Sequence, residues 1–352
     1  MTNFDDFKLS VEALSGGKNT VILDDIGMPS IVVPFPKLKY SDLIKGGTED
    51  VLPAFIVDGI EIDVIYVSKY QNIVVNDRAY SLPFKDPKTS INFDTALKVC
   101  RNKGLGWHLL SNALWATIQN WCYKNNTPPH GNTNYGYDYR NLHEKGVVTY
   151  KYTSDGKLLD GRTATGSGPV TWYHNYDSSG IADLCGNVWE WVAGFRLVDG
   201  EIQVIPNGNC MKIDCNMSNT STEWKTIMID GILKEPATQK EWESLKYDIV
   251  NGVQLSTKIT NSGSSSRQFG QLSVASDIKI PQILEGLGLF PVSDYTYGDG
   301  HLYVDNRGER LPLRGAGWYG MSDAGVAALN LNYSRAYSGS HIGFRAAFYE
   351  KL

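Results

Sequence analysis

The stretch that says most about the fold is "DLCGNVWEWVAG", residues 183–194. Trp189 and Trp191 are two positions apart, so in a β-strand they point to one face while Glu190 points to the other. A carboxylate among such bulk is either a buried hydrogen-bond anchor or one ligand of a calcium site. We favour the anchor, because calcium normally needs more carboxylates than this segment supplies.

Two helices are expected before this strand. Residues 93–106, "FDTALKVCRNKGLG", start with Asp94 as a plausible cap and have Gly104 placed to end the helix. Residues 111–129 start with Ser111, a second capping residue, and close with two prolines. Both helices are expected to cover a sheet.

The rest of the chain is expected to be strands and loops. Residues 1 to about 90 alternate short apolar runs with Gly, Pro and Asp, which predicts β-rich structure. A short strand is expected at His301–Val304. Residues 216–280 are polar, and "TNSGSSSRQFG" (260–270) within them is flexible enough to be an exposed insertion.

Composition excludes several classes of protein. The 352 residues are 42% hydrophobic and 20% charged, enough to bury a core, and the net charge of −5 argues against nucleic-acid binding. The start lacks a basic segment followed by an apolar run, and no stretch approaches the ~20 apolar residues of a membrane span. We therefore expect a protein made in the cytoplasm without a signal peptide and without membrane insertion. The five cysteines are too few and too scattered for a disulfide framework.

Several motifs together resemble the formylglycine-generating enzyme family, also called the sulfatase-modifying-factor domain. They are "GNVWEW" (186–191), the two-helix region 91–121, "LRGAGW" (313–318) and "IGFRAAF" (342–348). The resemblance implies an α+β protein with a variant of the C-type lectin fold. We expect a β-rich attachment region at 1–50 and one domain at 51–352, with an insertion at about 216–280.

The catalytic residues of that family are not all present. Family members that oxidise a cysteine use a cysteine pair between the last two motifs, whereas no cysteine follows Cys215 here. A zinc site at Cys210 and Cys215 lacks a second ligand pair, and the histidines show no ligand spacing. We expect no cofactor and no enzyme activity. The alternative is an oxidase of this type with a relocated site at Cys185, Cys210 or Cys215.

The C-terminal segment separates into two interleaved sets of residues. One set, which we call the frame, suits strands and packed turns. The frame consists of Arg314, Gly315, Trp318, Ala324 to Leu329, Leu331, Arg335, Ile342, Gly343, Phe344 and Arg345. The other set is expected to project outward, and consists of Gly317, Tyr319, Gly320, Ser322, Asp323, Asn330, Asn332, Tyr333, Tyr337, Gly339, Ser340 and His341.

The outward set has a restricted composition. From Leu311 to Tyr349 there is no Lys, Glu or Gln, although solvated surfaces usually carry them. Every residue of the set is reachable when the two adenines of an Asn codon are replaced by any base, and such codons never give Lys, Glu, Gln, Met or Trp. Tyr, Ser, Gly and Asn also dominate antibody combining sites. The alternative is a polar surface that binds nothing.

In this respect the segment at about 314–345 resembles the variable region of proteins diversified by diversity-generating retroelements. In that group, adenine-specific mutagenesis rewrites scattered codons on a C-type lectin scaffold. The resemblance implies that the twelve outward residues are variable and contact a ligand. We expect a phage tail-associated adhesin that binds a bacterial surface protein or glycan and joins the virion through its N-terminal region. A purely structural capsid or tail decoration is the third possibility.

Overall fold

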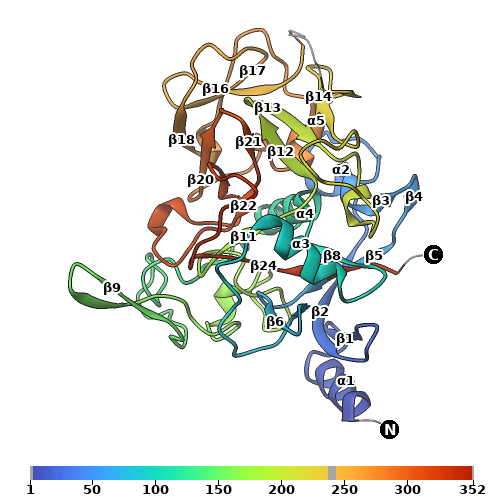
Figure 1. Cartoon of the computed structure of the whole chain (residues 1–352), viewed down its shortest axis with the longest axis vertical. Coiled ribbons are helices and arrows are strands. Elements are labelled where there is room, and N and C mark those ends of the chain that lie inside the picture. The colour runs from blue at the N-terminus through green and yellow to red at the C-terminus, as the bar shows by residue number, and fades with distance from the viewer. Residues whose placement is uncertain (1–2, 237–242, 351–352) are drawn as a thin grey trace.

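The computed structural model describes residues 3–236 and 243–350. Its strands form three larger β-sheets, and the helices lie around and between them (Figure 1). The α-helices are α1 (Asn3–Leu14), α2 (Tyr40–Leu43), α3 (Phe93–Arg101), α4 (Asn112–Lys124) and α5 (Gln282–Gly286). Short 3-10 helices are η1 (Pro53–Phe55), η2 (Val170–Trp172), η3 (Asn209–Met211), η4 (Phe269–Gln271) and η5 (Met321–Asp323).

The first sheet contains strands from near both ends of the chain. It is antiparallel, and its five strands lie in the order β1 (Thr20–Leu23), β2 (Pro29–Pro36), β5 (Val64–Ser68), β25 (Ala346–Phe348) and β8 (Trp107–Leu109). The C-terminal strand thus pairs on both sides with strands from the first third of the sequence.

The second sheet carries the tryptophan motif on a strand next to its edge. Its six strands lie in the order β18 (Ser264–Gln268), β20 (His301–Asp305), β23 (Leu329–Leu331), β22 (Leu313–Arg314), β11 (Trp189–Trp191) and β24 (Ile342–Phe344). Glu190 of β11 lies opposite Arg314 on one side and Gly343 on the other. The frame therefore forms both neighbours of the motif strand.

A third sheet lies above the second in the view of Figure 1. Its main path runs through β15 (Leu233–Lys234), β14 (Lys225–Ile227), β13 (Glu201–Val204), β16 (Lys246–Ile249), β17 (Val253–Ser256) and β19 (Ser273–Val274), with β12 (Phe195–Val198) and β21 (Glu309–Arg310) beside β13. Three hairpins complete the strands, namely β3 (Ile56–Val57) with β4 (Ile60–Glu61), β6 (Ile73–Val75) with β7 (Arg78–Tyr80), and β9 (Lys151–Ser154) with β10 (Lys157–Asp160).

Local sequence explains many of the turns. Asp58–Gly59, Asp155–Gly156 and Asp199–Gly200 each have two consecutive residues of positive φ, which is the geometry of the tight type I′ hairpin turn. Ser111 caps α4 by accepting a hydrogen bond from the Leu114 amide, as predicted. The cap of α3 is Asn92 rather than Asp94, because Asn92 lies one position outside the helix and accepts from the Thr95 amide.

The core is built around α4. Leu114, Trp115, Ile118 and Cys122 have no solvent exposure, and η1, α5 and α2 pack against this helix. The α+β class expected from the sequence is confirmed. No helix among residues 3–236 and 243–350 has the length and apolar character to cross a membrane.

Two regions differ from expectation. The N-terminal region contains the predicted strands β1 and β2 but begins with helix α1, which has no buried residue. Phe7 and Val11 are the apolar side chains of this helix that pack against the body. Two such positions give too weak an apolar periodicity to predict a helix from the sequence.

The polar segment 216–280 is more ordered than its composition suggests. Residues 237–242 lie outside the described residues, and the remainder supplies strands β14 to β19. Trp224, Tyr247 and Phe269 of this segment are fully buried. The serine-rich stretch predicted to be flexible forms edge strand β18, because backbone hydrogen bonds to β20 satisfy it without apolar side chains.

Candidate ligand-binding face

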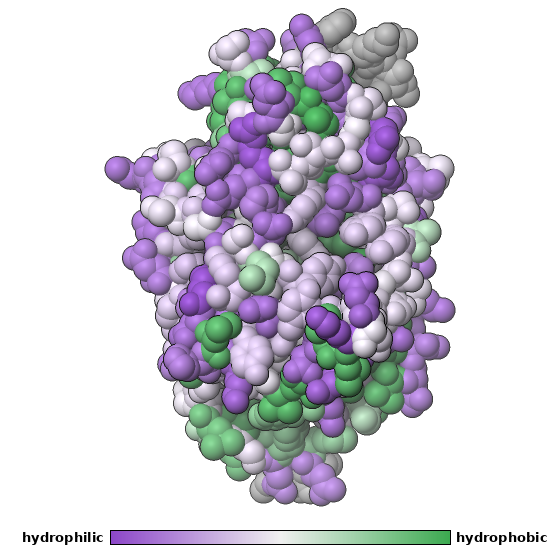
Figure 2. Space-filling view, turned by 90° about the vertical axis from the view of Figure 1, so that its left-hand side faces the viewer, coloured by the Kyte–Doolittle hydropathy of each residue, from purple (hydrophilic) through white to green (hydrophobic). Residues whose placement is uncertain are grey.

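Ten of the twelve outward residues lie at least partly exposed in the loops that follow β22 and β23. These loops lie on the left-hand side of Figure 1, the side that Figure 2 turns to the viewer. We call the ten residues the tyrosine face: Tyr319, Gly320, Ser322, Asp323, Asn332, Tyr333, Tyr337, Gly339, Ser340 and His341. The middle of the side shown in Figure 2 is mostly pale, of intermediate hydropathy, as Tyr, Ser and Gly are.

The other two residues of the set do not project outward. Asn330 is 7% exposed, because β23 lies in the sheet between β20 and β22 and its neighbours cover it. Its side chain accepts a hydrogen bond from the Asn332 amide. Gly317 is buried beneath Tyr319 and Trp189. The expectation of outward orientation is therefore wrong for these two positions.

The rings of the tyrosine face form one continuous row. Tyr333 and Tyr337 stack with centroids 4.1 Å apart, and Tyr337 lies 6.4 Å from His341. His341 is 5.9 Å from Tyr319, which meets the frame residue Trp318 edge-on at 5.5 Å. Residues up to 22 positions apart in the sequence are thus gathered on one surface.

Residues outside the outward set hold the backbone of the first loop. The Trp318 amide donates to the Asn187 carbonyl at 3.1 Å, and the Trp318 carbonyl accepts from the Tyr135 amide at 2.8 Å. The Met321 amide donates to the Thr133 carbonyl at 2.9 Å. None of these bonds uses a side chain of the tyrosine face, so they persist whichever residue stands there.

The second loop is held in the same way. Backbone carbonyls at 333, 335, 339 and 341 accept hydrogen bonds from the amides of Leu311, Phe93, Ser90 and Trp189, respectively. The frame residue Arg335 adds ion pairs to Glu309 and Asp94, at 3.0 and 2.6 Å. The loop is therefore fixed by its backbone and by one frame arginine.

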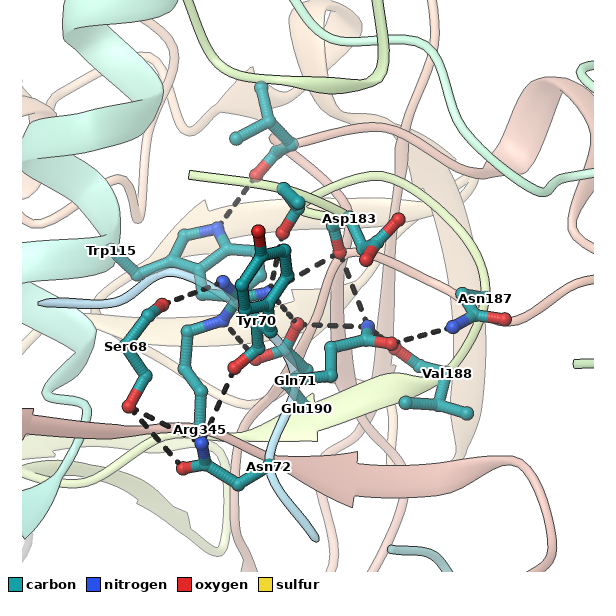
Figure 3. Close-up of polar contacts among 12 residues, drawn as sticks. Ser68, Tyr70, Gln71, Asn72, Trp115, Asp183, Asn187, Val188, Glu190 and Arg345 are labelled. Atoms are coloured by element: carbon teal, nitrogen blue, oxygen red, sulfur yellow. Dashed lines mark hydrogen bonds and ion pairs between the residues drawn. The ribbon is translucent and has the colours of Figure 1, made fainter. Parts of the chain in front are cut away.

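A buried polar network anchors the end of the segment (Figure 3). The Arg345 guanidinium donates to both oxygens of Glu190 at 2.6 Å, and Gln71 donates to the same carboxylate at 3.0 Å. Gln71 in turn accepts a hydrogen bond from Asn187 at 2.7 Å. Glu190 and Arg345 have no solvent exposure. Of the two roles considered for Glu190, these contacts fit the hydrogen-bond anchor.

Glycines distinguish frame from face. Gly315 has φ +87°, and a Cβ there would lie 2.9 Å from the Leu184 carbonyl oxygen. A Cβ at Gly343 would lie 2.8 Å from the Lys88 carbonyl oxygen. At Gly317, by contrast, the nearest atom is 3.5 Å away. A Cβ at Gly320 would lie 3.0 Å from the Ala324 side chain and one at Gly339 would lie 2.8 Å from the His341 ring, and neither glycine has positive φ. The frame glycines are thus closed by backbone atoms, whereas the nearest atoms at the other three belong to side chains.

The tyrosine face carries little charge at neutral pH. Burial raises the pKa of Tyr319 and Tyr333 and lowers the pKa of His341, so all three stay neutral. Asp323 is the single carboxylate of the face, and it accepts a hydrogen bond from the Tyr303 hydroxyl at 2.6 Å. The surface offers hydroxyl, amide and ring contacts rather than ion pairs.

The cysteines are placed unfavourably for thiol chemistry. Cys185, Cys210 and Cys215 are 1–3% exposed, and no disulfide joins the cysteines. Burial raises the pKa of Cys185 and Cys210 to about 12, whereas a reactive thiol needs a lowered pKa. A relocated oxidase site at these residues has no support in the structure.

One cluster of possible metal ligands escaped the sequence analysis. Atoms of His130, Asp138 and Glu144 lie within 4.8 Å of one another, on a loop without regular ligand spacing. Arg140 already pairs with Asp138 at 2.9 Å, and His130 Nδ1 lies 2.8 Å from Glu144. These internal contacts account for the cluster as part of the loop's own structure.

A second omission concerns the face itself. Tyr150 precedes hairpin strand β9 and Tyr152 lies within it. The ring centroid of each tyrosine is 5.9 Å from that of Trp318. Alternating tyrosines before an Asp-Gly turn are the sequence signal of a strand with one aromatic side, but nothing in the sequence places that strand beside residue 318.

Several solved structures are similar to this chain. PvdO from Pseudomonas aeruginosa is 14% identical with a TM-score of 0.36, covering 94% of this chain and 98% of that one. Treponema denticola variable protein 1 is 11% identical with a TM-score of 0.36, covering 94% and 99%. The Major Tropism Determinant U1 variant is 11% identical with a TM-score of 0.31, covering 94% and 71%. No family model and no curated protein matches the chain.

A variable protein and a tropism determinant are thus among the structural neighbours. The TM-scores are all below 0.5, so we base the proposals below on the residues of this chain.

Proposed function

We propose that this chain is a non-enzymatic binding protein whose C-terminal surface is diversified by a retroelement. It acts as a phage tail-associated adhesin that recognises a bacterial surface molecule through the tyrosine face. The observation that carries this proposal is the division of labour in residues 314–345. Exposed side chains of one restricted composition stand on loops whose backbones are held by residues outside the set.

The composition of the tyrosine face suits recognition. Tyrosine supplies a large amphipathic contact surface at low entropic cost, while Ser, Gly and Asn allow close approach and adaptable hydrogen bonds. A rigid scaffold under such side chains limits the ordering entropy that binding must overcome.

The N-terminal region is proposed to attach the chain to the virion. Helix α1 lies at the opposite end of the molecule from the third sheet (Figure 1). It exposes Leu9 (61%) and Leu14 (90%), apolar side chains that a partner subunit could cover.

A binding assay on intact bacteria tests the proposal. The purified, fluorescently labelled chain is incubated with a panel of bacterial strains and bound protein is measured by flow cytometry. We expect Tyr319→Ser and Tyr337→Ser each to weaken binding about 5- to 100-fold, which corresponds to roughly 1–3 kcal/mol per anchor residue. Ile60→Ser, an exposed apolar position in β4, is the control and leaves binding unchanged. A decoration protein would show no dependence on either tyrosine.

The neighbouring DNA tests the diversification separately. We expect a near-copy of the 3′ coding end that differs from it mainly at adenines, next to a reverse transcriptase gene. Differences spread evenly over frame and face codons would contradict the proposal.

A further inference from the structure

The hairpin β9–β10 stands beside the tyrosine face and is not among the twelve outward residues. In Figure 1 it extends from the body below the C-terminal loops. An isolated two-stranded hairpin is marginally stable in water, so a hairpin of this kind needs contacts at its base. Here the base rests on Trp318 through Tyr150 and Tyr152. Tyr135 stacks on Tyr152 from the other side, with centroids 6.4 Å apart.

A second contact joins the hairpin to the far end of the face. Arg162, two residues beyond β10, donates to the Ser340 carbonyl at 2.8 Å and lies 4.0 Å over the Tyr150 ring. Asp86 pairs with the same guanidinium at 2.7 Å. Together with the ring contacts of Tyr150 and Tyr152 with Trp318, which continue the aromatic row of the tyrosine face, the bond from Arg162 to Ser340 fixes the hairpin beside the face.

The two sides of the hairpin differ. Tyr152 lies directly opposite Leu159 in the antiparallel register, so both point to the side that faces Trp318. Thr153 and Leu158 form the next pair and point the other way, and Leu158 is 68% exposed. Among the described residues, β9 and β10 pair only with each other, which leaves one backbone edge of each strand open.

On the proposed function given above, we infer that the β9–β10 hairpin is a constant arm of the same binding site, and that the site takes an apolar segment of a protein. Leu159 and Tyr152 contact that segment from one side while the tyrosine face contacts it from the other.

The rings favour a polypeptide ligand over a glycan. Sugars stack on open ring faces, but Tyr333 and Tyr337 cover one face of each other, and Trp318 is 3% exposed beneath other rings. The site instead presents ring edges, hydroxyls and open strand edges, which suit backbone amides and apolar side chains. The single carboxylate of the face already has a partner, and on the hairpin Lys151 pairs with Asp160 at 2.9 Å, which leaves Lys157 as the exposed charge on the Leu159 side. Rings, hydroxyls and leucine therefore make up most of the site, which suits an apolar segment.

Two probes test the inference on the full chain. A phage-displayed library of random twelve-residue peptides is panned against it, and an array of bacterial glycans is screened in parallel. The dissociation constants of the enriched peptides are then measured for the unchanged chain and for Leu159→Ser, Leu158→Ser and Tyr337→Ser. Thermal unfolding of each variant shows that it is folded.

We expect enriched peptides with apolar residues, whose affinity falls at least 5-fold with Leu159→Ser and Tyr337→Ser and less than 2-fold with Leu158→Ser. Loss with Tyr337→Ser but equal affinity for the two leucine variants would overturn the role of the hairpin and keep the proposed function. No effect of Tyr337→Ser would overturn both. Binding to glycans without any peptide binding would overturn the protein ligand.

Discussion

The frame and the tyrosine face share one stretch of about thirty residues and obey opposite rules. Frame side chains such as Arg314 and Arg345 are fully buried and make specific hydrogen bonds to distant elements. Side chains of the face, such as Tyr319 and Tyr337, touch mostly each other, and they stand on backbones that other segments hold. Structure thus depends on the identity of the frame residues and on the backbone alone of the face residues.

The largest expected effect comes from the buried ion pair. Arg345→Ala leaves the Glu190 carboxylate buried without its charged partner, and we expect a loss of about 3–5 kcal/mol in the free energy of unfolding. Tyr337→Ser should change that free energy by less than about 1 kcal/mol. Urea denaturation followed by tryptophan fluorescence measures both. Equal losses in the two variants would erase the distinction between frame and face.

Glycine substitutions give the next largest contrast. Gly343→Ala drives a Cβ against the Lys88 carbonyl oxygen and Val188, and should destabilise the protein by about 2–3 kcal/mol. Gly317→Ala meets only ordinary contacts and should be nearly neutral. The shift in urea midpoint at constant slope reports each change. We expect Gly317 to accept alanine even though it is buried, and a large loss of stability there would contradict this.

The pH dependence of stability should also arise in the buried parts. Burial lowers the pKa of His108 to about 4 and of His174 to about 3. Below pH 6.5 these histidines are therefore protonated in the unfolded chain but not in the folded chain, so the stability of the fold decreases as the pH falls. Asp183 has the opposite sign, because burial raises its folded pKa to about 6.

Two histidines outweigh one aspartate, so we expect a net loss of about 2 kcal/mol in stability from pH 7 to pH 5. His174→Gln should flatten this slope strongly, whereas His341→Ser in the tyrosine face should flatten it less, because His341 is only partly buried. Stability curves at four pH values between 7 and 5 check the two variants against the original chain. A flatter slope in His341→Ser alone would reverse the comparison.

The smallest expected effect concerns the thiols. Because Cys185 and Cys210 are buried with a raised pKa, iodoacetamide at pH 8 should label neither in the folded chain and both in urea. Mass spectrometry of the labelled peptides shows the difference. Rapid labelling of the folded chain would revive the alternative of a cysteine oxidase.

Sequence reasoning succeeded where the signal is local. The Ser111 cap and the alternating tryptophans act within a few residues, and both appear as expected. Local patterns could not identify the partner of Glu190, because Arg345 lies 155 residues further along the chain. Arg345 reaches Glu190 from the junction between β24 and β25, which belong to different sheets. Asn330 looked like a surface residue because only the order of strands in the sheet buries it. The position of the hairpin could not be predicted either, because its contacts with Trp318 join residues more than 160 positions apart.

The most direct measurement of the central claim is the urea unfolding of one variant in which all ten residues of the tyrosine face are replaced together by other small or aromatic residues. We predict a single cooperative transition within about 2 kcal/mol of the original chain, because the hydrogen bonds that shape the loops come from the backbone and the frame. A loss of more than about 5 kcal/mol, or a transition that is no longer cooperative, would show that the face is part of the structure it was proposed only to decorate.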